Sequence, residues 1–284
     1  LRKAKEKTNG VIGVNIMVAL SNFSDMVKTS ISEKADIIFS GAGLPLDLPS
    51  YLEKESKTKL VPIVSSSRAA KLICEKWKNN YDYLPDAIVV EGPKAGGHLG
   101  YKNDQIENEH FSLEHIVPEV IEVIKVYEKS GHCKIPVIAA GGIADGRGIA
   151  AAFMLGAKGV QMGTHFVVTD ESQVHENYKE RIIKAKDIDS RVTGRTTGHP
   201  VRALRNDMTR KYLELENAGA GFEELEKLTL GGLRKAVVEG DVKNGSVMAG
   251  QIAGMVKERM SCKDLIQKLV TETDALIGGQ GFYE

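Results

Sequence analysis

Short apolar, β-branched runs alternate with longer segments whose apolar residues recur at helical spacing. Runs that end in or near Gly, Ser or Asn predict four strands, at residues 11–18, 36–43, 59–67 and 86–92. The intervening segments, for example residues 24–35, have the apolar spacing of amphipathic helices. This alternation predicts a parallel sheet with right-handed crossover connections.

Residues 135–164, IPVIAAGGIADGRGIAAAFMLGAKGVQMGT, are the most informative stretch of the chain. They predict a strand, a crossover helix and a second parallel strand, with glycine at each strand end, at Gly141-Gly142 and at Gly163. Glycine leaves backbone N–H groups accessible, and a helix that begins just beyond directs its positive end into the same space. An isolated Gly-Gly pair is typical of a tight turn. Two glycine-ended strands 22 residues apart favour a phosphate or nucleotide site.

Together these runs give six strand-helix units in the first two thirds of the chain. A doubly wound sheet concentrates functional residues at one switch point, whereas a (β/α)8 barrel carries them after nearly every strand. Functional-looking residues follow nearly every strand here, so we predict an α/β fold of the (β/α)8 TIM-barrel class. Six strands are two short of closure, and LRKAKEKTNG has the composition of a helix tail. We therefore expect the first two strands to be missing from this chain.

The alternation stops near residue 190. Glycine-separated segments then predict helices at residues 198–216, 222–228, 231–241, 245–260 and 263–277. We expect a barrel over residues 1–190, a helical lid or second domain over residues 191–260, and a final helix within residues 261–284 that packs back on the barrel. This appendage is long enough to cover the mouth of a barrel.

Composition excludes several classes of protein. The 38 basic and 38 acidic residues cancel, so no overall charge attracts nucleic acid or an anionic membrane. The three cysteines are far apart, which argues against a zinc site or a disulfide framework. The sequence has neither an apolar run of membrane-spanning length nor a signal-peptide core. We expect a soluble cytoplasmic protein without a metal site.

The loop after the fourth strand, EGPKAGGHLG at residues 91–100, contains the best candidate for a catalytic side chain. A single histidine usually lies at the surface or in a satisfied core, and this applies to His110, His115, His132 and His175. His98 differs because the glycines around it permit close approach of a ligand. An imidazole there can donate or accept a proton near neutral pH.

Four ordered motifs, GVNIM, EGxxAGGHxG, PVIAAGGIADGRG and VQMGTxF, resemble an FMN-dependent family. That family contains the nitronate monooxygenases, also called 2-nitropropane dioxygenases, and the type II enoyl-acyl-carrier-protein reductases. The resemblance extends over essentially the whole chain and implies a barrel with a helical second domain.

The resemblance also implies roles for individual residues. His98 corresponds to the catalytic histidine, Asn15 to a contact of the flavin ring, and Glu91 and Gly96 to residues that lie along it. Gly97 belongs to the same cofactor loop. The ribityl phosphate would be held by Gly141, Gly142, Gln161, Met162, Gly163 and Thr164.

Two features depart from the family pattern. The family normally opens with a strand followed by a flavin loop that contains glycine and methionine, and nothing in this sequence matches it. Lys94 stands where many members carry Glu in an EAGGH motif. If its ammonium faces the site it would attract anionic groups, and the alternative is an exposed lysine on a loop.

Within the family, the tracts GHPVRALRNDMTRKY and VVEGDVKNGSVMAGQIAG resemble the enoyl reductases, and nitronate oxidisers often carry Gln at the position of Glu91. These tracts favour an NAD(P)H-dependent reductase of fatty acid synthesis that acts on an acyl thioester. Whether acyl carrier protein is a partner, and whether the protein forms a homodimer, are left open. The basic tract at residues 201–211 could meet nucleotide phosphates or an acidic carrier protein, or form a solvated helix face. The alternatives are a nitronate monooxygenase and a phosphate-binding protein without redox activity.

Overall fold

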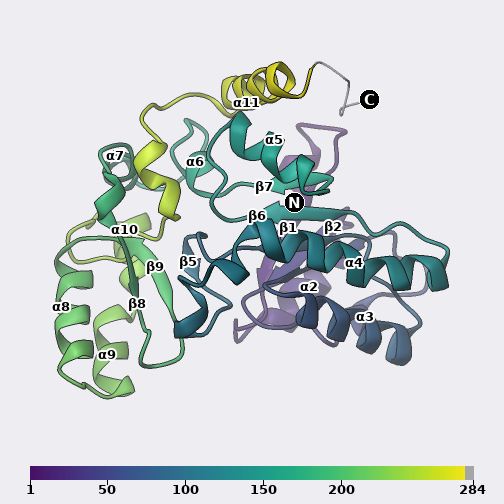
Figure 1. Cartoon of the computed structure of the whole chain (residues 1–284), viewed down its shortest axis with the longest axis horizontal. Helices are drawn as coiled ribbons and strands as arrows, with labels where there is room; N and C mark the ends of the chain where they lie inside the picture. The colour runs from purple at the N-terminus through teal and green to yellow at the C-terminus, as the bar shows by residue number, and fades with distance from the viewer. Residues whose placement is uncertain (279–284) are drawn as a thin grey trace. The chain divides into compact units, whose positions relative to one another are not determined.

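The computed structural model describes residues 1–278. It forms two compact units, which share the chain discontinuously. The first contains residues 1–91, 112–139 and 155–159, and the second contains residues 92–111, 140–154 and 160 onward. Figure 1 shows the course of the chain.

A parallel sheet follows the chain in strict sequence order, β1-β2-β3-β4-β6-β7. Its strands are β1 (Gly13–Met17), β2 (Ile37–Gly41), β3 (Lys59–Val64), β4 (Ile88–Glu91), β6 (Val137–Ala140) and β7 (Gly159–Gln161). Asn15 pairs with Phe39, and Phe39 pairs with Val61, so the first three strands are in continuous register. An open doubly wound sheet reverses its order at a switch point, whereas a barrel wall does not. All six predicted strands and the barrel-type α/β class are therefore confirmed.

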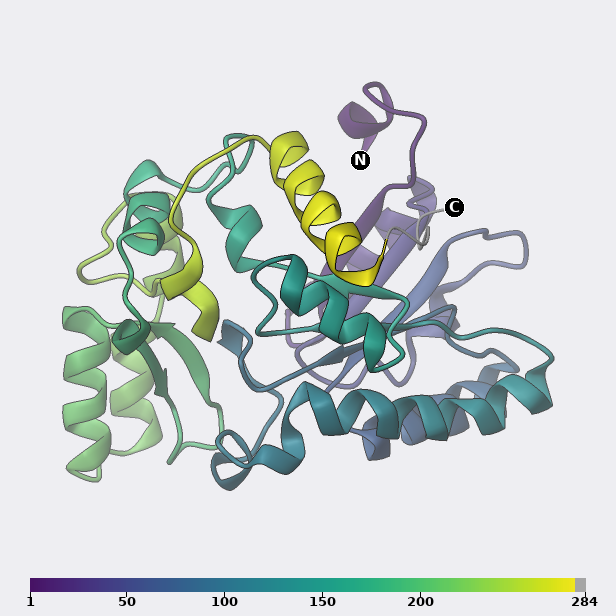
Figure 2. The same ribbon diagram turned by 45° about the horizontal axis from the view of Figure 1, so that its top comes forward.

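Three helices of the first unit, α2 (Phe23–Ser32), α3 (Ser67–Tyr81) and α4 (Leu113–Gly131), pack on this sheet through apolar faces. The short helix α1 (Arg2–Lys5) buries none of its residues, and a short 3₁₀ turn, η1, spans Leu48–Tyr51. Trp77 of α3 is fully buried, and its indole N–H donates to the carbonyl of Pro45 at 3.0 Å. Ser66 caps α3 by accepting from the N–H of Ala69. Helices α3 and α4 lie side by side (Figure 2).

The second unit contains an antiparallel sheet that the sequence did not indicate. Strands β5 (Gly97–His98), β9 (Val201–Leu204) and β8 (Ser190–Thr193) pair in that order. The predicted helix at residues 198–216 is therefore wrong over its first part. Asn206 accepts a hydrogen bond from the N–H of Thr209, so the helix begins only at Asp207.

The rest of the second unit is mainly helical. Its elements are η2 (Asn103–Gln105), η3 (Glu109–Phe111), α5 (Gly146–Met154), α6 (Thr164–Val167), α7 (Glu176–Ile183), η4 (Asp187–Asp189), α8 (Asp207–Asn217), α9 (Phe222–Thr229), α10 (Gly232–Val237), η5 (Gln251–Met255) and α11 (Cys262–Ile277). The helix predicted at residues 245–260 is reduced to the short turn η5. Three glycines interrupt this segment, and Gly254 packs so closely on Asp187 that an added Cβ would lie 2.2 Å from its Oδ1.

The last helix, α11, packs against α5 (Figure 2). An added Cβ at Gly146 would lie 2.4 Å from the Cβ of Glu272, and the N–H of Gly146 donates to the Glu272 carboxylate at 3.0 Å. Glycine is needed because the two helices approach so closely. Residues 279–284 of the predicted final segment lie outside the described residues, and the domain boundaries at residues 190 and 260 remain predictions. Among the described helices, none has both the length and the apolar character required to cross a membrane.

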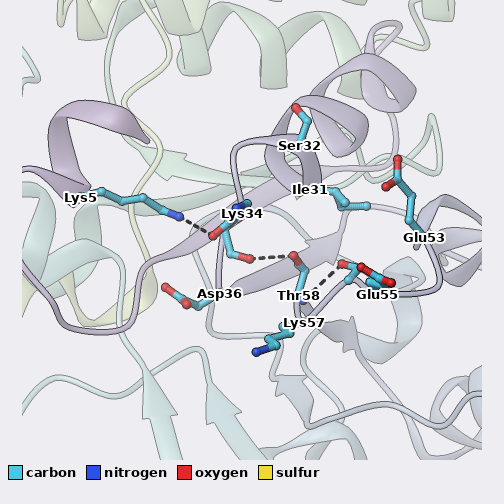
Figure 3. A pocket seen from close by; sticks show the side chains of 11 residues that line it. Lys5, Ile31, Ser32, Lys34, Asp36, Glu53, Glu55, Lys57 and Thr58 are labelled. Carbon is cyan, nitrogen blue, oxygen red and sulfur yellow. Dashed lines mark hydrogen bonds between the residues drawn. The ribbon is translucent and has the colours of Figure 1, made fainter.

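A pocket of about 570 Å³ lies in the first unit, where β2 and β3 begin (Figure 3). Positively charged lysines and negatively charged carboxylates line it. On one side of the pocket, the Lys5 ammonium donates to the carbonyl of Lys34 at 2.6 Å. Thr58 donates to the carbonyl of Ala35 at 2.8 Å. In barrel enzymes the amino ends of the strands serve stability, whereas the carboxyl ends carry the chemistry. This pocket is therefore not the candidate active site.

Candidate active site

The loop after β4 supplies the first part of the site. Gly92 donates its N–H to the carbonyl of Ala140 at 2.8 Å, which ties the start of this loop to the end of β6. An added Cβ at Gly96 would lie 2.5 Å from the carbonyl carbon of Ala249, so only glycine permits that contact. Gly97 has φ +78°, a conformation that glycine adopts without strain.

The loop after β6 packs directly on the loop after β4. Gly141 and Gly142 both have left-handed backbones, with φ of +86° and +89°. A Cβ added at Gly141 would lie 2.8 Å from the carbonyl oxygen of Gly92. A Cβ added at Gly142 would lie 3.0 Å from the Cβ of Lys94. The side chain of Lys94 thus extends over Gly142, and the lysine is exposed.

The loop after β7 joins these two through a segment from the C-terminal part of the chain. Thr164 accepts a 2.8 Å hydrogen bond at its Oγ1 from the N–H of Gly250. The next residue, Gln251, donates its N–H to the carbonyl of Lys94 at 3.0 Å. Residues 249–251 therefore connect the loops that follow β4 and β7.

These loops have the features of an anion-binding site. Among the described residues, the N–H groups of Gly141, Gly142 and Gly163 donate to no protein acceptor. A Cβ added at Gly163 would meet no atom within 4 Å, so the backbone there faces open space. The hydroxyl of Thr164 accepts from Gly250 and retains its own proton to donate. A phosphate group fits this donor set.

His98 lies on β5 and is exposed. Partial desolvation lowers the pKa of its imidazole, and the nearby charge of His199 lowers it further. A lowered pKa makes the protonated ring a stronger acid and leaves the neutral ring available as a base near neutral pH.

Arg202 supports this loop from the opposite face of the small sheet. It is 7% exposed, pairs with Gly97 across the strands, and donates to the carbonyl of Pro93 and to the hydroxyl of Ser190, each at 3.0 Å. Desolvation lowers the pKa of its guanidinium, and its Nε has no hydrogen-bond partner. Arg202 thus fixes the first residues of the glycine loop.

The basic tract at residues 201–211 does not present its cations as one surface. Arg202 is buried, Arg205 pairs with Asp189 at 3.3 Å, and Arg210 pairs with Asp207. The positive charges of Arg202, Arg205 and Arg210 are therefore engaged within the protein.

The remaining predicted residues lie on the strands or at their ends. Asn15 is exposed on β1, and Glu91, half-buried, is the last residue of β4. Burial raises the pKa of the Glu91 carboxyl to about 7. Both belong to the first unit. Gln161 ends β7 and Met162 follows it, and both side chains are half-buried. The contacts of Asn15 and Glu91 with the flavin ring, and those of Gln161 and Met162 with the ribityl phosphate, remain predictions.

Two histidines were missed by the sequence reasoning. His165 is 8% exposed, and its Nδ1 lies 2.9 Å from the carbonyl oxygen of Ala144, which links the loops after β6 and β7. His199 precedes β9 and lies near His98. The pattern around His199 did not reveal it because the β5-β9 pairing joins residues about one hundred positions apart.

A parallel sheet in sequence order, with glycine loops and a histidine following its strands, defines an enzyme of the α/β-barrel class. A model of the nitronate monooxygenase family matches residues 2–272. The chain therefore belongs to the nitronate monooxygenase family, whose members are flavin-dependent, and it is an oxidoreductase.

Individual relatives agree with this assignment. The structure of FabK from Thermotoga maritima is similar with a TM-score of 0.81 and 39% identity, over 98% of this chain and 80% of that chain. A nitroalkane oxidase from Streptomyces ansochromogenes shares the fold, with a TM-score of 0.74 and 20% identity over 99% of this chain and 85% of that chain. A Mycobacterium tuberculosis protein named (3aS,4S,5R,7aS)-5-hydroxy-7a-methyl-1-oxo-octahydro-1H-indene-4-carboxyl-CoA dehydrogenase is 28% identical, over 96% of this chain and 81% of its own length.

Proposed function

We propose that this protein is an FMN-dependent enoyl-acyl-carrier-protein reductase that uses NAD(P)H. The 39% identity to FabK, a type II enoyl-acyl-carrier-protein reductase, over nearly the whole chain is the observation that carries this proposal. The relative named as a carboxyl-CoA dehydrogenase supports an acyl thioester as the substrate class. Family membership also favours an oxidoreductase over the phosphate-binding protein without redox activity.

The donor set fits the phosphate of FMN. In this proposal the N–H groups of Gly141, Gly142 and Gly163 and the hydroxyl of Thr164 hold that phosphate. The flavin, when bound, supplies the hydride chemistry, and the protein supplies binding, orientation and electrostatics.

His98 is the proton donor of the proposed reaction. When a hydride reaches the β-carbon of the enoyl thioester, the α-carbon must gain a proton. The protonated imidazole of His98 breaks its N–H bond as the new C–H bond forms and keeps the electron pair. The left-handed backbone of Gly97 and the contact of Gly96 with residue 249 hold the loop that carries this ring.

Nitronate oxidation is the second candidate. A probable nitronate monooxygenase of Staphylococcus saprophyticus, 28% identical over 92% of this chain, favours it. His98 would then act as a base or hydrogen-bond donor toward the nitronate.

An anaerobic half-reaction experiment separates the two candidates. The purified protein, loaded with FMN, is mixed either with NADH and crotonyl thioester or with propyl nitronate alone, and the visible flavin bands are followed. A reductase bleaches with NADH and recovers its bands when the thioester is added. Bleaching by the nitronate without NADH would replace the reductase proposal with the oxidase. If His98→Ala turned over NADH with the thioester as fast as the parent, the role of His98 would be wrong.

A further inference from the structure

The strand pairing around His98 places a second imidazole beside it. Strand β5 runs antiparallel to β9, with Gly97 opposite Arg202 and His98 opposite Val201. The N–H of Leu99 donates to the carbonyl of Pro200 at 2.9 Å, which extends this register by one more pair. His199 therefore lies one position further along, opposite Gly100.

Alternation along the two chains puts both histidines on the same face. Residues directly opposite each other share a face, and neighbours along a strand point to opposite faces. His98 and His199 are exposed, whereas Leu99 and Pro200 between them are buried. His98 and His199 are thus diagonal neighbours, separated by about 7 Å or less between Cβ atoms, a distance that aromatic side chains can bridge.

Local packing leaves room for the two rings to approach. Gly100, directly opposite His199, has no side chain to stand between them. The ring of His199 packs on Phe222 of α9, with centroids 6.0 Å apart. This contact holds the His199 ring beside the strands.

We propose that His199 is the proton-transfer partner of His98, the two imidazoles forming a pair that exchanges a proton on the exposed face of this small sheet. The role in turnover rests on the proposed function. After His98 has given its proton to the α-carbon, protonated His199 breaks an N–H bond and returns a proton to the free electron pair of His98, directly or through one water. No electrons are transferred in this step, and solvent restores the proton on His199.

Other charged groups are carried by β9, by the loop before it and by α9, the elements that flank the pair. Arg202 of β9 lies on the opposite face, and Arg195, in the loop before β9, pairs with Glu107 and donates to Asn103. Glu223 and Glu224 follow Phe222 in the first turn of α9. Desolvation lowers the pKa of His98, and His199 is the group whose charge lowers it further.

A histidine titration of the FMN-loaded protein tests the pairing. The Cε1–H resonance of His98, assigned by its loss in His98→Asn, is followed against pH in the parent, His199→Gln and His199→Phe. Because a positive charge on His199 opposes protonation of His98, both variants are expected to raise the pKa of His98. His199→Phe preserves a ring against Phe222, so it reports the charge even if His199→Gln folds poorly. An unchanged His98 titration in these variants would overturn the pairing.

A matched control removes an imidazole elsewhere. His132, at the end of α4, has φ +51°, which Asn tolerates, so His132→Asn should fold and leave the His98 titration unchanged. An equal shift in this control would also overturn the proposal.

The half-reactions test the role in turnover. His199→Gln is expected to slow flavin reoxidation by crotonyl thioester about tenfold relative to flavin reduction by NADH, because only reoxidation requires the proton. An unchanged ratio would contradict the relay. A protein without thioester activity would overturn the proposed function, whereas the titration would still decide whether the histidines are coupled.

Discussion

Thr164 and Gly250, 86 residues apart in the chain, are joined by a 2.8 Å hydrogen bond from the Gly250 N–H to the Thr164 hydroxyl oxygen. The same hydroxyl belongs to the proposed phosphate site. A single side chain therefore both positions residues 249–251 and retains a proton to donate to a ligand.

Thr164→Val should weaken both the attachment of residues 249–251 and the binding of phosphate. The variant leaves the N–H of Gly250 without its acceptor, which costs about 1–3 kcal/mol of the free energy of unfolding. We expect FMN to bind at least tenfold more weakly, measured by quenching of flavin fluorescence. Thr164→Ser keeps the hydroxyl and should stay close to the parent in both measurements. Equal FMN affinity in the valine and serine variants would contradict the assignment.

Two glycines of the site should respond differently to an added methyl group. Gly96→Ala forces a Cβ to 2.5 Å from the backbone of residues 249 and 250, so it should reduce the free energy of unfolding by about 2 kcal/mol or more. The methyl group of Gly163→Ala has no atom within 4 Å, so the free energy of unfolding should stay close to that of the parent. The same methyl group should obstruct the phosphate. Urea unfolding and FMN titration of both variants check this. Undiminished FMN binding by Gly163→Ala would place the phosphate elsewhere.

Glu91 should make stability depend on pH. Burial raises the pKa of its carboxyl to about 7, so the folded state favours the neutral form. The corresponding stability is present below the ordinary carboxyl pKa and is lost as the pH rises through about 7. Glu91→Gln should therefore stabilise the protein at pH 8, by up to about 3 kcal/mol, and have little effect near pH 4.

Urea unfolding at the two pH values measures this difference. The exposed Glu214 of α8 provides a control, and Glu214→Gln should show no such dependence. A Glu91→Gln effect that is the same at both pH values would mean that the carboxyl is ionised normally in the folded protein.

Arg202→Lys should destabilise the loop that carries His98. Lysine retains the charge but cannot reach the Pro93 carbonyl and the Ser190 hydroxyl in the geometry of a guanidinium. We expect a loss of about 1–3 kcal/mol in the free energy of unfolding. Ser190→Ala removes only one of these partners and should cost less. A larger loss in Ser190→Ala than in Arg202→Lys would contradict the view that Arg202 holds the loop mainly through Pro93.

Local pattern predicted the six parallel strands because each is a short apolar run with turn residues at its end. It also predicted a shared site for the glycine ends at residues 141–142 and 163, because neighbouring parallel strands place their carboxyl ends at one edge. It failed at residues 201–204. VRAL is compatible with either helix or strand, and its antiparallel partners at residues 97–98 lie far away in the chain.

The sequence by itself determined the class of fold, the family and the loops of the candidate site, since strand periodicity and glycine at strand ends are local properties. The tertiary structure alone decided that Gly96 packs on residue 249, that Arg202 is buried beneath the loop, and that His199 lies beside His98. Each of these contacts joins segments about one hundred residues or more apart. Such pairings depend on how the whole chain packs, and a local pattern does not encode them.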